Sequence, residues 1–337
     1  MATKWGVVSA GKISNDFVAA VKGMCGSEHE FIAVAARNSF SAKSFASKHC
    51  ISKAYGSYEE LANDQEIEVV YIGSVNSQHF PLAKLMLENG KHVLLEKPMT
   101  LNLKQTRALG EIARKNKLFL MEVMALWSRF LPSYRYLVDI VNNGSIGDIV
   151  HVDANFGISM LDRERIVTRA LGGGTILDLG IYPLNAVSMI YNNEKPEKIV
   201  AVGHLNEDGV DISMTCSLKY SNNRTATVTT NGMAQLPNSL VIIGTKGQIK
   251  VPDVLYVATK IETKDGVVDF PLPKPTAFFN YPDSTGLAYE AIEVRECIKH
   301  GHLESIIMPL KDSELLAEIM DSIRHQVGVL YPEENAM

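Results

Sequence analysis

The sequence lacks the features that define several common classes of protein. It has four cysteines in 337 residues and no Cys-x-x-Cys pair, which argues against a disulfide framework and favours a reducing compartment. It has no apolar run near the ~18 residues that cross a membrane, no apolar signal core at its start and no basic cluster for nucleic acid. We therefore expect a cytoplasmic protein that binds neither a membrane nor a nucleic acid.

The composition is that of an ordinary globular protein. Hydrophobic residues make up 46% of the chain and charged residues 21%, with a net charge of −5. A length of 337 residues predicts about two domains, since one domain takes roughly 150. Such a chain buries a sizeable core without metal or disulfide support. The nine histidines show no ligand spacing, so we expect no metal site.

Short apolar runs alternate with helical patterns through the first third of the chain. This alternation predicts a doubly wound parallel sheet covered on both faces, an α/β domain of Rossmann type over residues 1–125. The expected strands are 5–10, 31–38, 69–75, 92–96 and 118–126, and the expected helices are 12–24, 41–48, 79–90 and 102–116.

The pattern changes after residue 125, where strands follow one another with few helices between them. Residues 126–337 are therefore expected to form an α+β domain with an open, mainly antiparallel sheet. The expected strands are 149–158, 198–205, 211–220, 224–233, 239–244, 248–251 and 254–259, and the expected helices are 133–142, 285–300 and 312–327. A glycine triplet, Gly172 to Gly174, opens one more apolar run.

The loop after the first strand resembles a degenerate dinucleotide fingerprint. It reads Ser9-Ala10-Gly11-Lys12-Ile13-Ser14 and keeps only the middle glycine, although Ser9 and Ser14 are small enough to replace the others. A cofactor pyrophosphate would lie at the start of the following helix. The alternative is a simple tight turn between a strand and a helix.

The end of the second strand bears on which cofactor binds. NAD sites place a carboxylate there for the ribose hydroxyls, but this strand ends in Arg37-Asn38. An arginine can pair with a 2′-phosphate, so we expect NADP. The alternative is a surface arginine without a ligand.

Several longer stretches resemble a known family of enzymes. The Gly-x-x-x-x-Gly pattern at the start, GKHVLLEKP at 90–98 and GGGTILDLGIY at 172–182 look like the Gfo/Idh/MocA oxidoreductases. Runs such as WGVVSAGKIS, SEHEFIAVAARN and KAYGSYEELA are similar to its branch of dimeric dihydrodiol dehydrogenases, which also oxidise D-xylose with NADP. The segment 121–130 is two residues longer than is usual in that branch.

The resemblance implies roles for individual residues. Lys97 matches the family's catalytic lysine, whose following peptide is usually cis, and Asp178 matches its aspartate. Tyr182 stands where sugar and inositol members carry histidine, and His79 matches a histidine near the nicotinamide ribose. The implied cofactor contacts also include Ser9, Gly11, Lys12, Ile13, Arg37, Asn38, Ser74, Asn76, Glu96 and Lys97 itself.

The chemistry of three of these side chains fits an alcohol dehydrogenation. Asp178 and Tyr182 are four residues apart at the start of a helical pattern and so would share one face. Tyrosine, with a reference pKa of ~10, needs a nearby cation to act as a base at neutral pH. Lys97 would supply that charge, making Tyr182 the expected general acid/base. Without Lys97, a helix cap and a packed tyrosine would explain the pair equally well.

These observations predict an NADP-dependent oxidoreductase for a cyclic vicinal diol or an aldopyranose such as D-xylose. Trp127, Phe156 and Phe279 are the aromatic residues expected at the substrate, with core packing as the alternative. A homodimer through the C-terminal sheet is expected, as is usual in the family. Two other functions stay open: a non-catalytic NADP sensor on the same fold, and a reductase of another small carbonyl compound.

Overall fold

The computed structural model describes residues 1–123, 127–252 and 254–334. The chain forms two compact units. Unit 1 comprises residues 1–99, 104–127 and 272–310, and unit 2 comprises residues 100–103, 128–271 and 311–337. The boundary predicted between residues 125 and 126 falls at residues outside those described, so it stays a prediction. The units themselves are not continuous stretches of sequence, because 272–310 packs in unit 1.

Unit 1 is built on a six-stranded parallel sheet with the strand order β3-β2-β1-β4-β5-β6, the order of a dinucleotide-binding doubly wound fold. Its strands are β1 (Thr3–Val8), β2 (His29–Ala35), β3 (Lys53–Tyr55), β4 (Val69–Ile72), β5 (His92–Leu95) and β6 (Leu120–Glu122). Its helices are α1 (Lys12–Met24), α2 (Ser39–His49), α3 (Tyr58–Ala62), α4 (His79–Glu88), α5 (Leu103–Asn116) and α9 (Leu287–Lys299). The expected strands and helices of this region are present, except that residues 124–126 of the last expected strand lie outside those described; β3 and α3 are additional.

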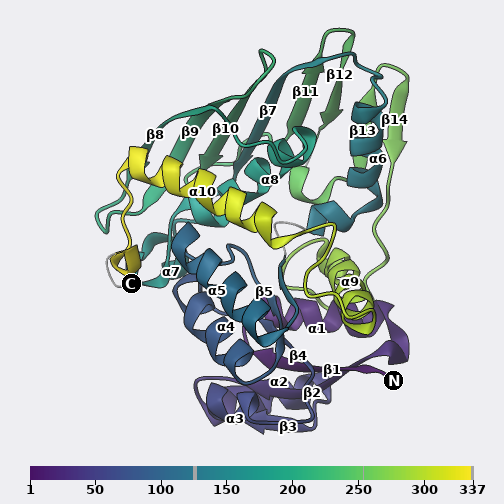
Figure 1. The fold of residues 1–337 in the computed structure, drawn as a ribbon, viewed down its shortest axis with the longest axis vertical. Coiled ribbons are helices and arrows are strands. Elements are labelled where there is room, and N and C mark those ends of the chain that lie inside the picture. The colour runs from purple at the N-terminus through teal and green to yellow at the C-terminus, as the bar shows by residue number, and fades with distance from the viewer. Residues whose placement is uncertain (124–126, 253, 335–337) are drawn as a thin grey trace. The chain divides into compact units, whose positions relative to one another are not determined.

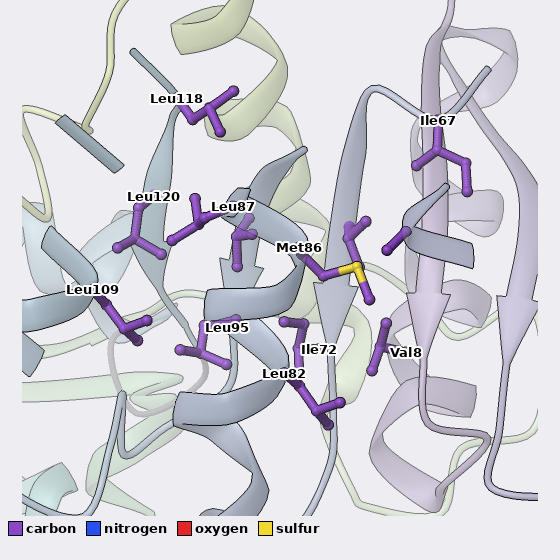
Figure 2. Close-up of a cluster of buried hydrophobic side chains, with 14 of the residues drawn as sticks. Val8, Ile67, Ile72, Leu82, Met86, Leu87, Leu95, Leu109, Leu118 and Leu120 are labelled. Carbon is purple, nitrogen blue, oxygen red and sulfur yellow. The ribbon is translucent and has the colours of Figure 1, made fainter. Parts of the chain in front are cut away.

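Both faces of the parallel sheet are buried, as the apolar strands require. On one face, Leu82 and Met86 of α4 pack against the sheet at Ile72, as Figure 2 shows. On the other face, Phe17 of α1 stacks on Tyr71 of β4 with ring centroids 4.0 Å apart. Burial on both sides fixes the strand ends in place, and those ends carry the polar residues considered below.

A buried carboxylate holds the returning segment 272–310 in unit 1. Asp16 of α1 accepts hydrogen bonds from the backbone N–H groups of Asn280 and Tyr281, each at 2.8 Å, and from the hydroxyl of Ser284 at 3.1 Å. The α9 helix that follows lies beside α1 (Figure 1). This segment therefore belongs to the Rossmann-type unit although it lies far along the chain.

Unit 2 contains an eight-stranded sheet with the order β14-β13-β12-β11-β7-β10-β9-β8. All its pairs are antiparallel except β7 with β10. The strands are β7 (Ile149–Gly157), β8 (Lys198–Leu205), β9 (Asp211–Lys219), β10 (Thr225–Asn231), β11 (Leu240–Gly244), β12 (Gly247–Val251), β13 (Lys260–Thr263) and β14 (Gly266–Asp269). The helices are α6 (Pro132–Asn142), α7 (Glu164–Val167), α8 (Ile181–Ile190) and α10 (Leu310–Val327). The predicted fold class is thereby confirmed.

One strand prediction in this unit is wrong. Residues 254–259 were expected to form a strand, but Leu255–Val257 forms a 3₁₀ turn. The carbonyl of Leu255 accepts from the buried hydroxyl of Tyr134, and its N–H donates to Asn238 at 2.8 Å. The segment is apolar because Leu255 and Val257 are buried in the core. The next two strands, β13 and β14, were not predicted. The turn dipeptide Asp265-Gly266 between them is a hairpin signal that could have indicated them.

Candidate active site

The carboxyl ends of four neighbouring strands of unit 1 are in register. Val8, the last residue of β1, pairs with Ala35 of β2 on one side and with Ile72 of β4 on the other. Ile72 in turn pairs with Leu95, the last residue of β5. Ligands of open α/β sheets bind outside this edge. Every cofactor contact expected from the sequence follows one of these four strands within seven residues.

The loop after β1 leaves the start of α1 open to a ligand. Gly11 occupies the N-cap position with extended backbone, and no side chain of the described residues caps the helix. Ser9 has φ = 81°, a left-handed conformation that favours glycine, and its N–H donates to Ala35 at 3.0 Å. Uncapped N–H groups at a helix start are suited to a phosphate, so these residues fit a dinucleotide pyrophosphate.

The third fingerprint position, Ser14, is not glycine, but a glycine of the neighbouring strand end lies opposite it. Ser14 of α1 is fully buried, and its hydroxyl has no partner among the residues described. A Cβ placed on Gly73, just after β4, would lie 2.6 Å from that hydroxyl. Close packing of helix against sheet needs one small partner. Here Gly73 provides the space that the fingerprint usually provides on the helix.

Arg37 and Asn38 follow β2 and have different surroundings. The Asn38 side chain accepts from the N–H of Ser41 at 2.8 Å and so caps α2. Arg37 is exposed. Burial of Tyr58 raises the pKa of its hydroxyl, and the positive charge of Arg37 opposes part of that rise. The charged side chain that follows β2 is therefore an exposed cation, and its contact with a 2′-phosphate stays a prediction.

Buried carboxylates hold the backbone around Lys97, which is 9% exposed. Glu96 accepts from the hydroxyl of Tyr71 at 2.5 Å and from the N–H of Lys97 at 3.3 Å. Glu122 of β6 accepts from the N–H of Met99 at 2.7 Å. The peptide between Lys97 and Pro98 is cis, as the family resemblance implied. No sequence pattern marks Glu122 for this role, because its partner is a backbone group in the loop after β5.

His79 connects the loop after β4 to the loop after β5. Its Nδ1 lies 2.7 Å from the carbonyl of Pro98, and its Nε2 lies 3.2 Å from the carbonyl of Ser74. Two carbonyl acceptors favour a protonated ring, but complete burial outweighs them and lowers the pKa of His79 to about 4, assisted by the charge of Lys97. The neutral ring has one N–H to donate, and the shorter distance assigns it to Pro98. A contact between His79 and a nicotinamide ribose stays a prediction.

Unit 2 holds the other two residues of the expected catalytic group. Asp178 lies in a π-helical turn, Ile176–Gly180, that leads directly into α8. Such turns are rare and are frequent at functional sites. Both carboxylate oxygens of Asp178 bind the guanidinium of Arg165, at 2.6 and 3.3 Å. Arg165 was not among the predicted site residues; its one signal in the sequence is a charged stretch, Asp162 to Arg165, that precedes the glycine triplet.

Tyr182 belongs to a cluster of three aromatic rings. Its ring centroid lies 5.3 Å from Phe156 of β7 and 5.3 Å from Tyr256 of the 3₁₀ turn, and the latter two are 5.0 Å apart. Tyr256 was not expected here because its segment was predicted to be a strand. The other two expected substrate residues, Trp127 and Phe279, lie in unit 1. Trp127 is buried and Phe279 is half-buried, and residues 124–126 of the longer segment lie outside those described.

The described part of the chain shows neither a metal-binding cluster nor a membrane-spanning helix. Among residues 1–123, 127–252 and 254–334, no three histidine, cysteine or acidic side chains gather as metal ligands would. None of the helices described combines the length and apolarity needed to cross a bilayer. The ionisable residues at the strand ends of unit 1 and around Asp178 therefore remain the main candidates.

A parallel sheet in this strand order, with an open helix start at its carboxyl edge, defines a dinucleotide-binding protein of Rossmann type. The family model described as "Oxidoreductase family, NAD-binding Rossmann fold" matches residues 3–123, and the model of the family's C-terminal domain matches residues 134–250. The chain belongs to the Gfo/Idh/MocA family and is an NAD(P)-binding oxidoreductase.

Curated relatives match along the whole chain. A trans-1,2-dihydrobenzene-1,2-diol dehydrogenase of Xenopus tropicalis is 45% identical over 332 residues, covering 98% of this chain and 100% of the relative. The enzyme of the same name from Homo sapiens is 42% identical over 334 residues, covering 99% of this chain and 99% of the relative. The similarity thus includes both units.

Solved structures share the complete fold. A 3-ketoreductase of Actinomadura kijaniata, solved with NADP and TDP-benzene, is 25% identical with a TM-score of 0.83, covering 98% of this chain and 99% of that one. An aldose-aldose oxidoreductase of Caulobacter crescentus, solved with glycerol, is 20% identical with a TM-score of 0.83 and 97% coverage of both chains. The second similarity concerns the fold alone.

Proposed function

We propose that this oxidoreductase uses NADP and transfers hydride between NADP(H) and a cyclic vicinal diol, such as a trans-dihydrodiol, or an aldopyranose such as D-xylose. The observation that carries the proposal is the 42–45% identity, over the whole chain, to enzymes named as dihydrodiol dehydrogenases. Lys97, Asp178 and Tyr182 are all present, and a protein that only sensed the cofactor would need none of them.

The preference for NADP rests on Arg37. A guanidinium at the end of β2 can pair with a 2′-phosphate, whereas NAD sites carry a carboxylate there. The 3-ketoreductase at 25% identity was solved with NADP. We expect NADP to bind more tightly than NAD by ~1.5–3 kcal/mol, the range for hydrogen bonds to charged groups. Comparing the two dissociation constants in wild type and Arg37→Asp tests this, and an unchanged preference would exclude the role.

The proposed roles follow from the chemistry of each group. NADP, when bound, accepts or supplies the hydride. Tyr182 would take the hydroxyl proton during oxidation and return it during reduction. Lys97 would favour the charged tyrosinate and hold the substrate oxygen, and Asp178 would orient the substrate or its neighbours. The proposal requires that the two units bring Lys97 and Tyr182 to the same substrate molecule.

The proposed cofactor contacts are the residues that follow the four strand ends. The N–H groups around Gly11, Lys12 and Ile13 would bind the pyrophosphate, with Ser9 shaping the turn. Ser74, Asn76, His79, Glu96 and Lys97 would lie along the nicotinamide half, and Asn38 beside Arg37. Residues 1–125 would thus act mainly on the cofactor and residues 126–337 on the substrate and in dimerisation.

The aromatic cluster favours a substrate with an apolar ring face. Phe156, Tyr182 and Tyr256 lie within 5.3 Å of one another, and aromatic faces pack well against planar or ring-shaped ligands. We propose Trp127 and Phe279 as further contacts. Replacing Phe156 with alanine should raise KM for a dihydrodiol more than KM for D-xylose, since only the former presents an unsaturated ring.

A substrate panel tests the reaction. We expect NADPH absorbance to appear when the enzyme meets NADP with trans-dihydrodiols or aldopyranoses. Tyr182→Phe should lower kcat by the ~10²–10⁴-fold typical of a lost general base, with little change in cofactor affinity. Lys97→Met should lower kcat and shift the pH profile upward, and the two losses should not add. Tight NADP binding without turnover would favour the sensor, and activity on unrelated carbonyl compounds alone would favour the third function.

The open face of the unit 2 sheet supports a homodimer as part of the proposal. Val200 and Val202 on β8 are 52% and 68% exposed, on the face opposite α8. Exposed valines of this kind suit burial against a partner, and a second copy of the chain can provide that partner symmetrically. Light scattering should give about twice the chain mass of 37.1 kDa, and Val200→Glu/Val202→Glu should halve it. A monomeric wild type at micromolar concentration would contradict the dimer.

A further inference from the structure

The glycine triplet of unit 2 lies directly against the backbone of α7. A Cβ placed on Gly173 would lie 2.5 Å from the carbonyl of Ile166 and 2.8 Å from that of Thr168. Real Cβ atoms do not come so close to backbone oxygens, so any residue other than glycine would push the two segments apart. Gly172 has φ = 73°, also a conformation that favours glycine.

Two hydrogen bonds fix this contact, and a third continues it toward Asp178. The N–H of Gly173 donates to Thr168 at 3.1 Å, and the N–H of Gly174 donates to Ile166 at 2.8 Å. The carbonyl of Gly174 then accepts from the N–H of Asp178 at 3.2 Å. A short backbone path therefore joins Ile166 to Asp178, and Arg165 is the residue next to Ile166.

This path places Arg165 opposite the expected catalytic carboxylate. The guanidinium binds both oxygens of Asp178, a two-point contact that fixes direction as well as distance. Asp178 is 4% exposed, whereas the Arg165 side chain is 36% exposed. A buried carboxylate with a partly solvated cation keeps its charge at a moderate cost of desolvation.

We propose that Arg165 is a positioning residue that orients Asp178, and that the glycine triplet exists to hold Arg165 in place. The inference rests on the proposed function, in which Asp178 faces the substrate. A carboxylate paired on both oxygens is a poor base, so Asp178 acts by accepting a hydrogen bond from the substrate or its neighbours, not by taking the proton. Lysine cannot replace the arginine fully, because an ammonium does not bind two oxygens in a plane.

A stability measurement tests the pairing without relying on activity. The charged side chain of unit 2 in contact with the Asp178 carboxylate is Arg165, which precedes Ile166 on α7. In Arg165→Gln the buried carboxylate loses its cation, so its pKa rises above the unfolded value. Its contribution to stability is then complete below pH ~4 and is lost as the pH rises through the new pKa. The denaturant midpoint of Arg165→Gln should therefore fall relative to wild type between pH ~4 and 8, and adding Asp178→Asn should remove this pH dependence.

Turnover gives the second measurement. Loss of orientation should lower kcat of Arg165→Gln by roughly 10–100-fold, as misplaced groups do, while the dissociation constant for NADP stays the same. The kcat profile should gain an acid limb where Asp178 now protonates. Arg165→Lys should retain the wild-type profile with a smaller loss in kcat, which a purely structural role would not explain.

Arg163 provides the matched control. It lies two residues from Arg165 and makes no ion pair among the residues described. Arg163→Gln removes the same charge from the same segment and should leave both pH profiles unchanged. The inference is overturned if Arg165→Gln parallels Arg163→Gln in stability, or if its kcat profile keeps the wild-type shape. If wild type turns over no substrate in the panel, the proposed function fails, and the stability comparison still decides the pairing.

Discussion

The two units hold their buried charges by different means. In unit 1 the partners are mostly uncharged: Asp16 and Glu122 accept hydrogen bonds from backbone N–H groups. In unit 2 the partners are mostly opposite charges, as in the pairs Arg165–Asp178 and Arg129–Asp312. Unit 1 thus uses its carboxylates to fix loops at a sheet edge, whereas unit 2 uses arginines to fix carboxylates.

The difference determines what a substitution leaves behind. Removing an acceptor in unit 1 frees a loop and leaves neutral N–H groups, each costing ~1–3 kcal/mol when buried. Removing a cation in unit 2 leaves a buried charge, which costs more. The two units should therefore respond differently to neutralisation of their buried charges.

The largest effect is expected for Arg129, which is 4% exposed and binds Asp312 at 2.6 Å and Asn185 at 2.8 Å. Arg129→Met leaves the Asp312 carboxylate buried without its cation and should lower the free energy of unfolding by ~3–5 kcal/mol. Chemical denaturation measures the loss.

Two controls accompany this prediction. Adding Asp312→Asn should restore part of the loss, because the stranded charge is then removed. Lys195→Met breaks a pair of similar length, 2.7 Å, with both side chains exposed, and should cost less than ~1 kcal/mol. Equal losses for the buried and the exposed pair would contradict the comparison.

Asp16 gives the corresponding test in unit 1. Asp16→Asn leaves one acceptor oxygen for N–H groups that now use two, and should lower the free energy of unfolding by roughly 2–4 kcal/mol. Limited proteolysis should then cut near residues 276–286 sooner than in wild type. Asp139→Asn, at an exposed position on α6, is the control and should change stability by less than ~0.5 kcal/mol. Unchanged proteolysis would show that other contacts hold the segment.

Asp211 is the exception in unit 2, because it is held as unit 1 holds its carboxylates. It accepts from the hydroxyl of Thr175 at 2.6 Å and from the N–H of Ile176 at 2.8 Å. Burial raises its pKa to about 6, although these donors oppose the rise. The folded state therefore binds the proton more tightly than the unfolded state does.

The sign of the pH dependence follows from this raised pKa. The contribution of Asp211 to stability is complete below pH ~4 and is lost as the pH rises through about 6. The difference in unfolding free energy between wild type and Asp211→Asn should accordingly fall by up to about 3 kcal/mol between pH ~4 and 7. A difference that is flat with pH would show that Asp211 stays charged throughout.

The smallest effect concerns backbone conformation alone. Ser9 has φ = 81°, a conformation that costs a residue with a Cβ ~1–2 kcal/mol and costs glycine nothing. Part of this gain is offset because glycine loses more backbone entropy than serine on folding. Ser9→Gly should raise the free energy of unfolding by ~0.5–1 kcal/mol. Ser57→Gly, at a position with extended backbone, should not stabilise. If Ser9→Gly lowers stability, the Ser9 hydroxyl makes a contact worth more than the strain.

Much of the fold was predictable because the periodicity of apolar residues and the residues typical of turns are local features of the sequence. The β1, α1 and β2 elements followed from apolar runs and a small-residue turn, and the ends of α4 and α10 were marked by Gly90 and Gly328, both with positive φ. Lys97 could be singled out because a proline follows it at a strand end.

The parts that could not be predicted depend on contacts between distant segments. Arg165 and Asp178 are thirteen residues apart, and the close approach of Gly173 to the backbone of Ile166 lies between them in the chain. The segment around Leu255 reads as a strand because burial and strand formation leave the same apolar pattern. Asp16 and its partners at 280–284 are separated by more than 260 residues, so no local pattern connects them.

The interleaving of the two units in the sequence constrains how such an enzyme can be recombined. The chain passes from one unit to the other after residues 99, 103, 127, 271 and 310. No single cut would therefore separate the two units, and residues 100–103 belong to unit 2 while Lys97, three positions earlier, belongs to unit 1. Exchange of one unit as a cassette between relatives would need several matched junctions, so new substrate preferences in this architecture are expected to arise by point changes in its loops.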